Sequence, residues 1–386
     1  MKNRIIALVD CDSFFVSCEQ ADNPELKNTP ICVVSGSNGC VVSRSKEAKQ
    51  LGIKMGLPLF MAKKEFPKAN YIVANHDKYS AYSKKVMACL NDFSPDVQVV
   101  SVDEAFIDLT GTSALFKRNY LDIAKMIRKT ILEKTDISVS IGVSLSKTLA
   151  KLASDKAKKT GGIYVIGTRK ILSVLEKTKV DEISGIGPAN NLILRREGIF
   201  LASEFVDKSD TWVKSKLGVL GLGLKHELLG EVVYPVENKY EPPKSIQDTS
   251  TICDGQFSSD ETVIKMEISR HIHSACSRLR SHSGKCLCVG LMLKHKDFTV
   301  VYDRKMLVKP TDFELTLQKV VNEMFAKLFN PKMVYRATGV ILEQLSFSDG
   351  EQLSLFSQPD EKEQKLSKCI DNIEKRFGKN SIRTGF

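Results

Sequence analysis

The order of strand-like and helix-like segments in the first part of the chain constrains its fold more than any other feature. Apolar or alternating runs, typical of strands, are interrupted by helical stretches and by one pair of strands joined through a tight turn. We expect strands at 4–9, 31–35, 41–43, 97–111 and 137–144, and helices at 46–52, 78–92, 119–135 and 145–159. A doubly wound sheet would alternate strand and helix, so this order favours a split βαβ, ferredoxin-like α+β core.

The first of these strands ends in acids. In "IALVDCDSFF" the apolar run stops at Asp10 and Asp12, and two aromatic residues follow. In one interpretation, Asp12 and Ser13 cap the helix after an ordinary strand. In the other, Asp10 holds a cation at the strand end. This stretch alone leaves both interpretations open.

Two more acids, Asp103 and Glu104, are expected in the tight turn within 97–111. If the strands are neighbours, three carboxylates meet at one sheet edge and require a counter-charge. Oxygen-only ligands select Mg²⁺ or Mn²⁺ over zinc. Two such ions can clamp the attacking and leaving oxygens of an in-line phosphoryl displacement. The alternative is a surface turn whose acids are solvated.

Positive charge is clustered near these segments. The chain has a formal net charge of +11, which attracts polyanions, nucleic acid first. Two runs, "SRSKEAK" at 43–49 and "DKAKKTGG" at 155–162, would supply the cations that a triphosphate needs opposite its metals. Backbone N–H groups at the strand-to-helix junction of the first run would add to this. A solvated lysine face is the alternative for each run.

Two further motifs point to a nucleotide and to a nucleic-acid backbone. A flat ring from Phe14 or Phe15 beside the metal site would stack under a sugar and exclude a 2′-hydroxyl. The segment "ISGIGP" at 183–188 has the form of a helix-hairpin-helix turn. Its residues Gly185, Ile186 and Gly187 would bring backbone N–H groups close to a phosphate without reading sequence.

The rest of the chain divides by composition. At about 100–200 residues per domain, 386 residues predict two to four domains. Residues 168–233 are mostly helical, and 236–244 read as a linker with two prolines. A second small α+β domain follows, with a helix at 260–280, strands at 285–294 and 298–304, a helix at 312–329 and a strand at 335–343. Residues 347–386 are a polar tail.

Other features limit the setting in which the protein works. No apolar run approaches the roughly 18 residues of a membrane span, and the N-terminus lacks the pattern of a secretory signal. The ten cysteines are scattered, with no CxxC pair or zinc spacing. We therefore expect reduced thiols and a cytoplasmic, nucleoid-associated protein without a membrane partner.

Four blocks carry a family likeness. The segments "ALVDCDSFFVSCE", "VVSRSKEAKQLGIKMGLPLF", "SVDEAFID" and "SIGVSLSKTLAKLASDKAKKTGG" resemble, in family order, the defining blocks of Y-family (translesion) DNA polymerases. The residue pattern of the second block and the C-terminal segment "IDNIEKRFGKNSIRTG" most resemble the UmuC-like branch. Proteins of this branch are catalytic subunits of the DNA polymerase V type. The likeness covers essentially the whole chain.

The resemblance implies a right-handed polymerase. The palm would comprise 1–35 and 79–167, the fingers 36–78, and the thumb with its helix-hairpin-helix 168–235. The linker at 236–244 would lead to a little-finger domain at 245–346 and a tail at 347–386. Two Mg²⁺ ions, or Mn²⁺ as a substitute, would serve as cofactors.

The resemblance also assigns roles to single residues. Asp10, Asp103 and Glu104 match the catalytic metal carboxylates, and Cys11 matches the position that lends a backbone carbonyl to metal. Phe15 matches the aromatic steric gate against ribonucleotides, with Phe14 beside the sugar. The positions that match triphosphate contacts are Ser43, Lys49 and Lys158. Lys46 stands where relatives outside this branch often have a phosphate-contacting tyrosine, and Arg44 is a branch feature without an assigned target.

The tail contains a string that resembles a clamp-binding peptide. In "QLSLF", Gln352 and Leu353 would begin the peptide by which bacterial polymerases bind the sliding clamp, and Leu355 and Phe356 would fill an apolar pocket. A random match is the alternative. The UmuC resemblance further suggests a UmuD-like accessory subunit and a recombinase filament.

Together these features predict an error-prone, DNA-directed DNA polymerase for translesion synthesis in DNA repair and the SOS response. It would add dNTPs to a primer on damaged template DNA by two-metal-ion catalysis. The sequence shows no proofreading exonuclease motif. A nucleotidyl cyclase also uses strand-end acids and two metals, but would not need the hairpin, the second domain or the clamp peptide. A catalytically silent DNA-bound scaffold would not need its carboxylates.

Overall fold

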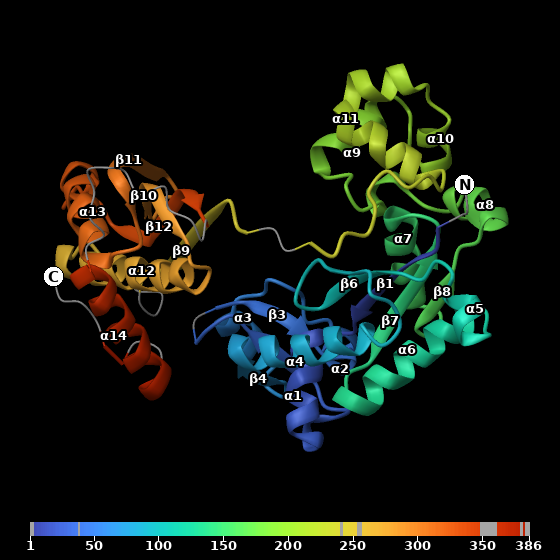
Figure 1. Cartoon of the computed structure of the whole chain (residues 1–386), viewed down its shortest axis with the longest axis horizontal. Helices are drawn as coiled ribbons and strands as arrows, with labels where there is room; N and C mark the ends of the chain where they lie inside the picture. Colours follow the sequence, from blue (N-terminus) through green and yellow to red (C-terminus); the bar gives the residue numbers. More distant parts are fainter. Residues whose placement is uncertain are drawn as a thin grey trace. The chain divides into compact units, whose positions relative to one another are not determined.

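The computed structural model divides the chain into two compact units, 1–239 and 240–386, each described by itself (Figure 1). It describes residues 4–37, 39–239, 242–252, 257–347, 361–378 and 381–382. No helix in these ranges is long and apolar enough to cross a membrane. The nine cysteines within them are free thiols, as expected.

A five-stranded sheet of order β5-β6-β1-β7-β8 forms the centre of the first unit. The strands are β1 (Ile6–Cys11), β5 (Val97–Val99), β6 (Glu104–Asp108), β7 (Val139–Ser144) and β8 (Ile163–Val165). The central strand β1 runs antiparallel to both β6 and β7, and all residues of β1 and β7 are buried. Strands, helices and one antiparallel pair are thus arranged as the element order predicts, and the α+β class is confirmed.

Helices cover both faces of this sheet. Apolar residues of α4 (His76–Leu90) and α6 (Tyr120–Thr135) share one core with Ala7 and Val9 of β1. On the other face, Ala150 of α7 (Lys147–Ala157) packs on Ile6 and Leu8. Because side chains alternate along a strand, β1 contributes to both cores.

Helix α7 approaches the sheet unusually closely at one glycine. A Cβ atom on Gly142 of β7 would lie 2.0 Å from the Ser154 nitrogen and 2.2 Å from the Ala150 carbonyl oxygen. Both are backbone atoms of α7, which cannot give way independently. The absence of a side chain at Gly142 therefore sets how close α7 lies to the face of the sheet.

A smaller three-stranded sheet of order β3-β2-β4 belongs to the same unit. It contains β2 (Ile31–Val34), β3 (Val41–Arg44) and β4 (Asn70–Val73), with α2 (Lys46–Gln50) and α3 (Leu59–Glu65). Ser45 caps α2 by accepting from the Ala48 N–H. Helix α1 (Phe14–Asp22) and the 3₁₀ turn η1 (Pro24–Leu26) connect β1 to this sheet. Since β2 is part of it, the small sheet begins before residue 36.

Short helices form the remainder of the first unit. They are α5 (Thr112–Phe116), η2 (Thr168–Lys170), α8 (Ile171–Leu175), η3 (Val180–Glu182), α9 (Pro188–Arg196), α10 (Ala202–Val206) and α11 (Asp210–Leu228). Those from α8 onward share a core around Phe205 and Leu194. Gly218, with φ of 70°, interrupts α11.

The start of the expected linker is fixed to the first unit. Val236 is buried with Ile6 and Leu8 against the five-stranded sheet. The Glu237 N–H donates to the side chain of Gln98, and the Asn238 amide donates to the Pro95 carbonyl at 3.0 Å. Chain that reads as a linker by composition is therefore anchored as far as Asn238.

The second unit is a four-stranded antiparallel sheet with helices. Its order is β11-β10-β12-β9, formed by β9 (Ser245–Thr251), β10 (Lys285–His295), β11 (Val300–Thr311) and β12 (Tyr335–Ser346), with α12 (Glu261–Ser281) and α13 (Glu314–Leu328). The polar strand β9 is absent from the sequence prediction, and β11 extends beyond the expected 298–304. The residues of β9 and of the extended part of β11 are mostly polar or exposed, so these segments show no apolar pattern that would predict a strand.

A helix also lies in the segment expected to be a polar tail. This helix, α14 (Glu361–Phe377), is strongly amphipathic and buries Ile370 and Ser367. Its acids reach residues of the second unit: Glu374 bonds His273 at 2.9 Å, and Asp371 pairs with Arg280 at 2.7 Å. Part of the tail is thus folded onto the second unit.

Candidate active site

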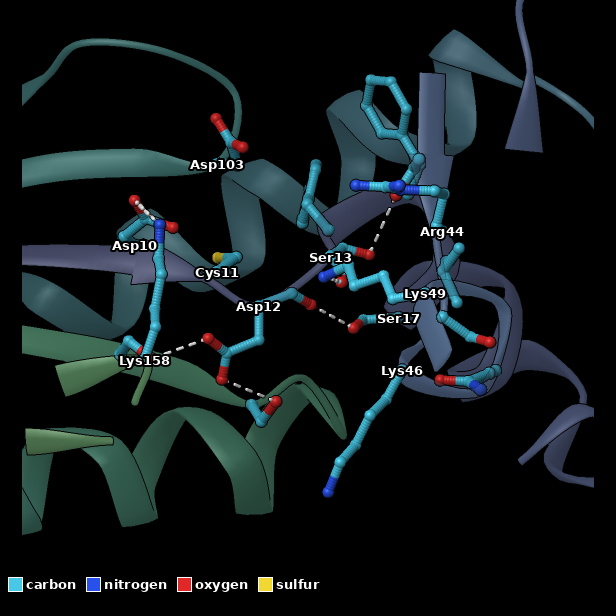
Figure 2. A pocket seen from close by; sticks show the side chains of 18 of the residues that line it. Asp10, Cys11, Asp12, Ser13, Ser17, Arg44, Lys46, Lys49, Asp103 and Lys158 are labelled. Atoms are coloured by element: carbon cyan, nitrogen blue, oxygen red, sulfur yellow. Dashed lines mark hydrogen bonds and ion pairs between the residues drawn. The ribbon is translucent and has the colours of Figure 1, made fainter. Parts of the chain in front are cut away.

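A cavity of about 1080 Å³ lies where the end of β1, the β3–α2 junction and the end of α7 meet (Figure 2). Nine of the predicted site residues line it: Asp10, Cys11, Phe14, Phe15, Ser43, Lys46, Lys49, Asp103 and Lys158. These residues come from segments up to about 150 positions apart in the sequence. The structure therefore brings these predicted site residues together at one cavity.

Asp10 and Glu104 lie directly opposite each other in the sheet. They are register partners of β1 and β6, so their side chains share one face. The expectation that Glu104 lies in the turn is wrong: it begins β6, and its carbonyl accepts the Val100 N–H at 3.0 Å. The turn itself occupies residues 100–103. Pairing with β1 and β5 extends the strand to Glu104.

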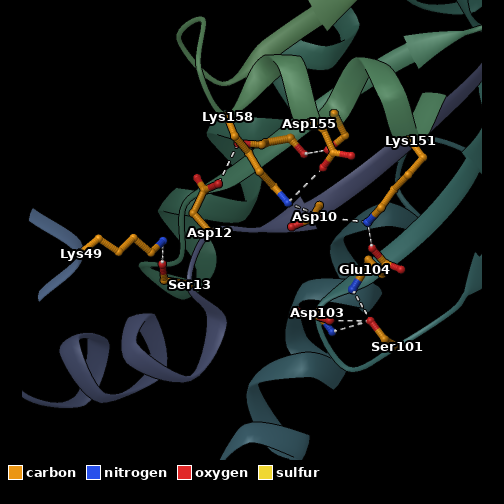
Figure 3. Close-up of polar contacts among 12 residues, drawn as sticks. Asp10, Asp12, Ser13, Lys49, Ser101, Asp103, Glu104, Lys151, Asp155 and Lys158 are labelled. Atoms are coloured by element: carbon orange, nitrogen blue, oxygen red, sulfur yellow. Dashed lines mark hydrogen bonds and ion pairs between the residues drawn. The ribbon is translucent and has the colours of Figure 1, made fainter. Parts of the chain in front are cut away.

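The third acid, Asp103, is turned to its own hairpin. Its carboxylate accepts the Ser101 hydroxyl (Figure 3). In the described part of the chain, no group of three or more His, Cys, Asp or Glu side chains is arranged so that it could hold a metal ion. The expected convergence is thus present for two carboxylates and not for the third. Without a divalent cation, mutual repulsion opposes bringing three ionised carboxylates together.

Two lysines of α7 neutralise the paired acids. Lys151 bonds Glu104 and lies 3.3 Å from the Asp10 carboxylate, while Lys158 lies 2.8 Å from Asp10. Burial is the largest single influence on Lys151 and opposes its charge, but the hydrogen bonds that Lys151 donates to Glu104 and Asp10, together with the charges of both acids, raise the pKa of Lys151. The oxygen donors of Asp10 and Glu104 thus already share a cation. This donor set fits the hard ions Mg²⁺ and Mn²⁺.

The helix-capping interpretation of the β1 end is wrong. Asp12 accepts the hydroxyls of Ser138 and Ser140, at 3.0 and 2.7 Å, so it fastens β1 to β7 rather than capping a helix. Ser13 begins α1 in the left-handed region (φ 47°, ψ 47°) and makes no side-chain cap. Strain of this kind in a residue other than glycine is typical of functional sites. The sequence does not predict Ser13 as a ligand-binding residue, because its strained backbone leaves no signal in the pattern of residue types.

The β3–α2 junction is linked to this turn. Lys49 donates to the Ser13 hydroxyl at 2.9 Å, and Ser43 donates to the Ser13 carbonyl at 3.4 Å. Burial, and then the charge of Arg44, lower the pKa of Lys49. Arg44 itself donates to the Ile53 carbonyl. Lys46 lines the same cavity, so cations surround the turn at Ser13.

The two phenylalanines have different environments. Phe14 is 4% exposed and belongs to the core, whereas Phe15 is partly exposed at the cavity. Phe15 stacks on Tyr79 with ring centroids 4.4 Å apart and an angle of 15°. The Tyr79 hydroxyl is fixed by Glu19 at 2.7 Å. The ring of Phe15 is therefore held flat at the cavity wall.

The predicted hairpin at 183–188 is formed. Gly185 has φ of +100°, a value that favours glycine, and Gly187 precedes α9 with Pro188 as its first residue. The preceding element is the 3₁₀ turn η3, shorter than a helix. Ile186 is 8% exposed and its N–H donates to Ile183, so Ile186 supports the turn from inside. The clamp-like string at 352–356 lies outside the described residues.

Comparison with known proteins identifies the family. Residues 9–155 match the impB/mucB/samB family, and residues 243–355 match its C-terminal domain. The DNA polymerase IV of Oceanobacillus iheyensis is 30% identical over 391 residues, which cover 99% of this chain and 91% of the relative. Solved Y-family polymerases also match. The chain belongs to the Y family of DNA polymerases.

Relatives of this Y-family chain come from two branches. Protein UmuC of Salmonella typhimurium is 29% identical over 98% of the chain and 92% of the relative. DNA polymerase IV from Bacillus subtilis is 30% identical over the whole chain and 93% of the relative. The UmuC-like resemblance is therefore present, and the DNA polymerase IV group is equally similar.

Solved structures agree with the fold. A Y-family polymerase chimera of Dbh and Dpo4 has a TM-score of 0.76 and 27% identity, covering 89% of this chain and all of that one. An insertion ternary complex of Dbh DNA polymerase has a TM-score of 0.60 and 26% identity, with the same coverage. The expected fold class is confirmed.

Proposed function

We infer that this Y-family protein is an error-prone translesion DNA polymerase, which adds dNTPs to a primer 3′-hydroxyl opposite damaged template bases. One observation carries the inference. The paired carboxylates of Asp10 and Glu104 end two neighbouring strands beside a cavity that also presents Phe15, Lys49 and Lys158. Acids for metals, cations for phosphates and a ring for the sugar are the requirements of this reaction.

The carboxylates would hold the metal ions. Asp10 and Glu104 are in place, Asp103 would turn from Ser101, and Cys11 would add its carbonyl oxygen. Two bound Mg²⁺ ions, or Mn²⁺ in their stead, would supply charge neutralisation at the attacking and leaving oxygens. Since strand pairing fixes Asp10 and Glu104, only the hairpin residue Asp103 has to rearrange.

The cations around Ser13 would bind the triphosphate. Lys49 and Ser43 reach it from the β3–α2 junction, and Lys158 faces them across the cavity from α7 (Figure 2). Lys46 lies on the same junction and would add charge. The backbone turn at Ser13 opens α1, whose N-terminal N–H groups favour anions.

Phe15 would exclude ribonucleotides. Tyr79 stacks behind its ring, so the ring cannot retreat from an added 2′-hydroxyl. A hydroxyl without room or a hydrogen-bond partner is costly at such a surface. Phe14, fixed in the core, would keep the backbone beside the sugar in place.

Further features of the proposal concern DNA and partners. The hairpin at Gly185 and Gly187 would contact the DNA backbone. A small sheet with little buried core, β3-β2-β4, as fingers would check base-pair shape poorly, which is consistent with low fidelity. We include in the proposal sliding-clamp binding through 352–356, a UmuD-like subunit and recombinase filament, an SOS role, and a cytoplasmic, nucleoid-associated location.

Primer extension on an abasic template with Mg²⁺ tests the proposal. The wild type should extend past the lesion, and the Asp103→Ala/Glu104→Ala double variant should not. Glu133→Ala, an exposed acid on α6, is the matched control and should retain activity. Primer-template binding, measured by fluorescence anisotropy, should be retained in all three proteins.

Three results would contradict the proposal or a part of it. Equal extension by the double variant would remove the carboxylates from the chemistry. No extension by the wild type, with clamp and accessory subunits added but DNA still bound, would favour the scaffold alternative. An error rate on undamaged DNA close to that of a replicative polymerase would contradict the low-fidelity part.

A further inference from the structure

Lys151 lies between the two carboxylates that the proposed polymerase site uses. It projects from α7 across the face of the sheet, and its ammonium bonds Glu104 and lies 3.3 Å from Asp10 (Figure 3). The side chain is 24% exposed, against 8% for Asp10 and 21% for Glu104. The ammonium thus lies within the acidic pair instead of on the surface.

Its neighbour Lys158 differs in two respects. Lys158 touches Asp10 but not Glu104 in the described contacts, and it shares its charge with Asp155 at 3.6 Å. Its side chain is 38% exposed and lines the cavity. Lys151 does not line the cavity and bridges both acids. Of these two lysines, Lys151 is therefore the one that holds the acidic pair together.

The bridge also affects where Glu104 points. Asp10 and Asp103 line the cavity, whereas Glu104 does not, and its carboxylate is bonded to Lys151. A divalent ion shared by Asp10 and Glu104 would lie at the oxygens that the ammonium now contacts. Two cations at one pair of oxygens repel each other, so the ion and Lys151 exclude each other there.

We propose that Lys151 is a positioning residue that holds Asp10 and Glu104 together in the metal-free protein and competes with the divalent ion for both. This inference rests on the proposed function, because it assumes that the two acids hold the metal. Its consequence is opposite to that of a simple structural lysine. Removing the charge of Lys151 should strengthen metal binding while it weakens the metal-free fold.

Mn²⁺ binding to the full-length protein, without DNA or nucleotide, tests the inference. Free Mn²⁺ is measured by electron paramagnetic resonance for the wild type and for Lys151→Met, which keeps the length of the side chain and removes its charge. Lys151→Arg keeps the charge. Lys159→Met is the control, because it removes one exposed charge next to Lys158.

We expect Lys151→Met to bind Mn²⁺ at least about tenfold more tightly than the wild type, a change of only about 1.4 kcal/mol. Lys151→Arg and Lys159→Met should stay within about twofold of the wild type. Adding Asp10→Asn to Lys151→Met should abolish the gain. The melting temperature of Lys151→Met should fall without metal and recover with Mn²⁺, since Glu104 loses the cation with which it forms a partly buried ion pair.

Three outcomes would overturn the inference. They are unchanged or weaker Mn²⁺ binding by Lys151→Met, equal tightening by Lys159→Met, and a gain that survives Asp10→Asn. These outcomes are separate from the primer-extension result. A protein that extends primers through its carboxylates but binds Mn²⁺ independently of Lys151 loses only this inference. If Lys151→Met binds Mn²⁺ more tightly as expected, but the Asp103→Ala/Glu104→Ala variant still extends primers, the proposed catalytic mechanism is contradicted instead.

Discussion

His273 couples the C-terminal helix α14 to pH. It is 5% exposed and lies between two acids, Glu314 of α13 at 3.0 Å and Glu374 of α14 at 2.9 Å. The hydrogen bond with Glu314, followed by that with Glu374, outweighs burial and raises the pKa of His273 to about 9. The imidazolium thus links α14 to the rest of the second unit, beside the Asp371–Arg280 pair.

The sign and size of the effect follow from this shift. Because the folded pKa is raised above the ordinary 6.5, the stabilisation is complete below about pH 6.5 and is lost as pH rises through about 9. A difference of about 2.5 units at about 1.4 kcal/mol each gives about 3 kcal/mol. Although burial lowers it, ion pairing with Asp371 and Glu314 raises the pKa of Arg280, so the guanidinium stays charged over this range.

Amide hydrogen exchange of the 361–377 peptide in the full chain measures how much of the stabilisation of α14 is lost as pH rises. After correction for intrinsic rates, protection of α14 should fall between pH 6 and pH 9.5 by up to about a hundredfold, an upper limit because the contact of His273 with Glu314 remains when α14 opens and only that with Glu374 is lost. His273→Gln should lower protection at pH 6 and remove the pH dependence. The peptide over α6, in the first unit, is the internal control. Protection that is equal at both pH values, or the same pH dependence in His273→Gln, would refute the reasoning.

Three further predictions concern the first unit. Gly142→Ala should destabilise the protein by about 1–3 kcal/mol in urea unfolding, because the new Cβ collides with the backbone of α7. Gly185→Ala should cost about 1–2 kcal/mol at its φ of +100° and weaken primer-template binding, whereas Gly187→Ala, with φ of −76°, should leave stability unchanged. Phe15→Ala should raise ribonucleotide incorporation by about 10–200-fold, and Tyr79→Ala should do so in part, measured as the ratio of kcat/KM for dNTP and rNTP.

The contradicting results differ for each. Wild-type stability of Gly142→Ala would mean that α7 can move from the sheet without cost. Equal effects at Gly185 and Gly187 would remove the argument from backbone conformation. If the ratio of kcat/KM for dNTP and rNTP is unchanged in Phe15→Ala, another residue must exclude ribonucleotides.

Sequence patterns predicted the residues of the site better than their arrangement. The apolar run before Asp10 and the pair of strands around Glu104 are local signals, so the strands and their acids are predictable. Whether Asp103 joins them depends on which cation is present, and that is absent from the sequence. The role of Asp12 also depends on a contact with β7, about 130 residues away.

Elements that are mostly polar and bury few apolar side chains are not predictable from the sequence pattern. Strand β9 alternates between exposed and partly buried polar residues and is held by pairing with β12. Helix α14 is polar on average, so its composition suggests a tail, although it buries Ile370 and an ionic contact to His273. Such elements are stabilised by tertiary partners rather than by local propensity.

The anchoring of the chain at Val236 to Asn238 leaves a short connection between the units. From residue 239 to Ser245, where β9 begins, the chain can span at most about 20 Å. If both units bind one partner, a tether of this length would place the second binding surface at a millimolar effective concentration once the first is engaged. Neither unit then needs high affinity of its own for a shared partner. Lengthening this segment would weaken the combined affinity of the two units for that partner, although neither binding surface would change.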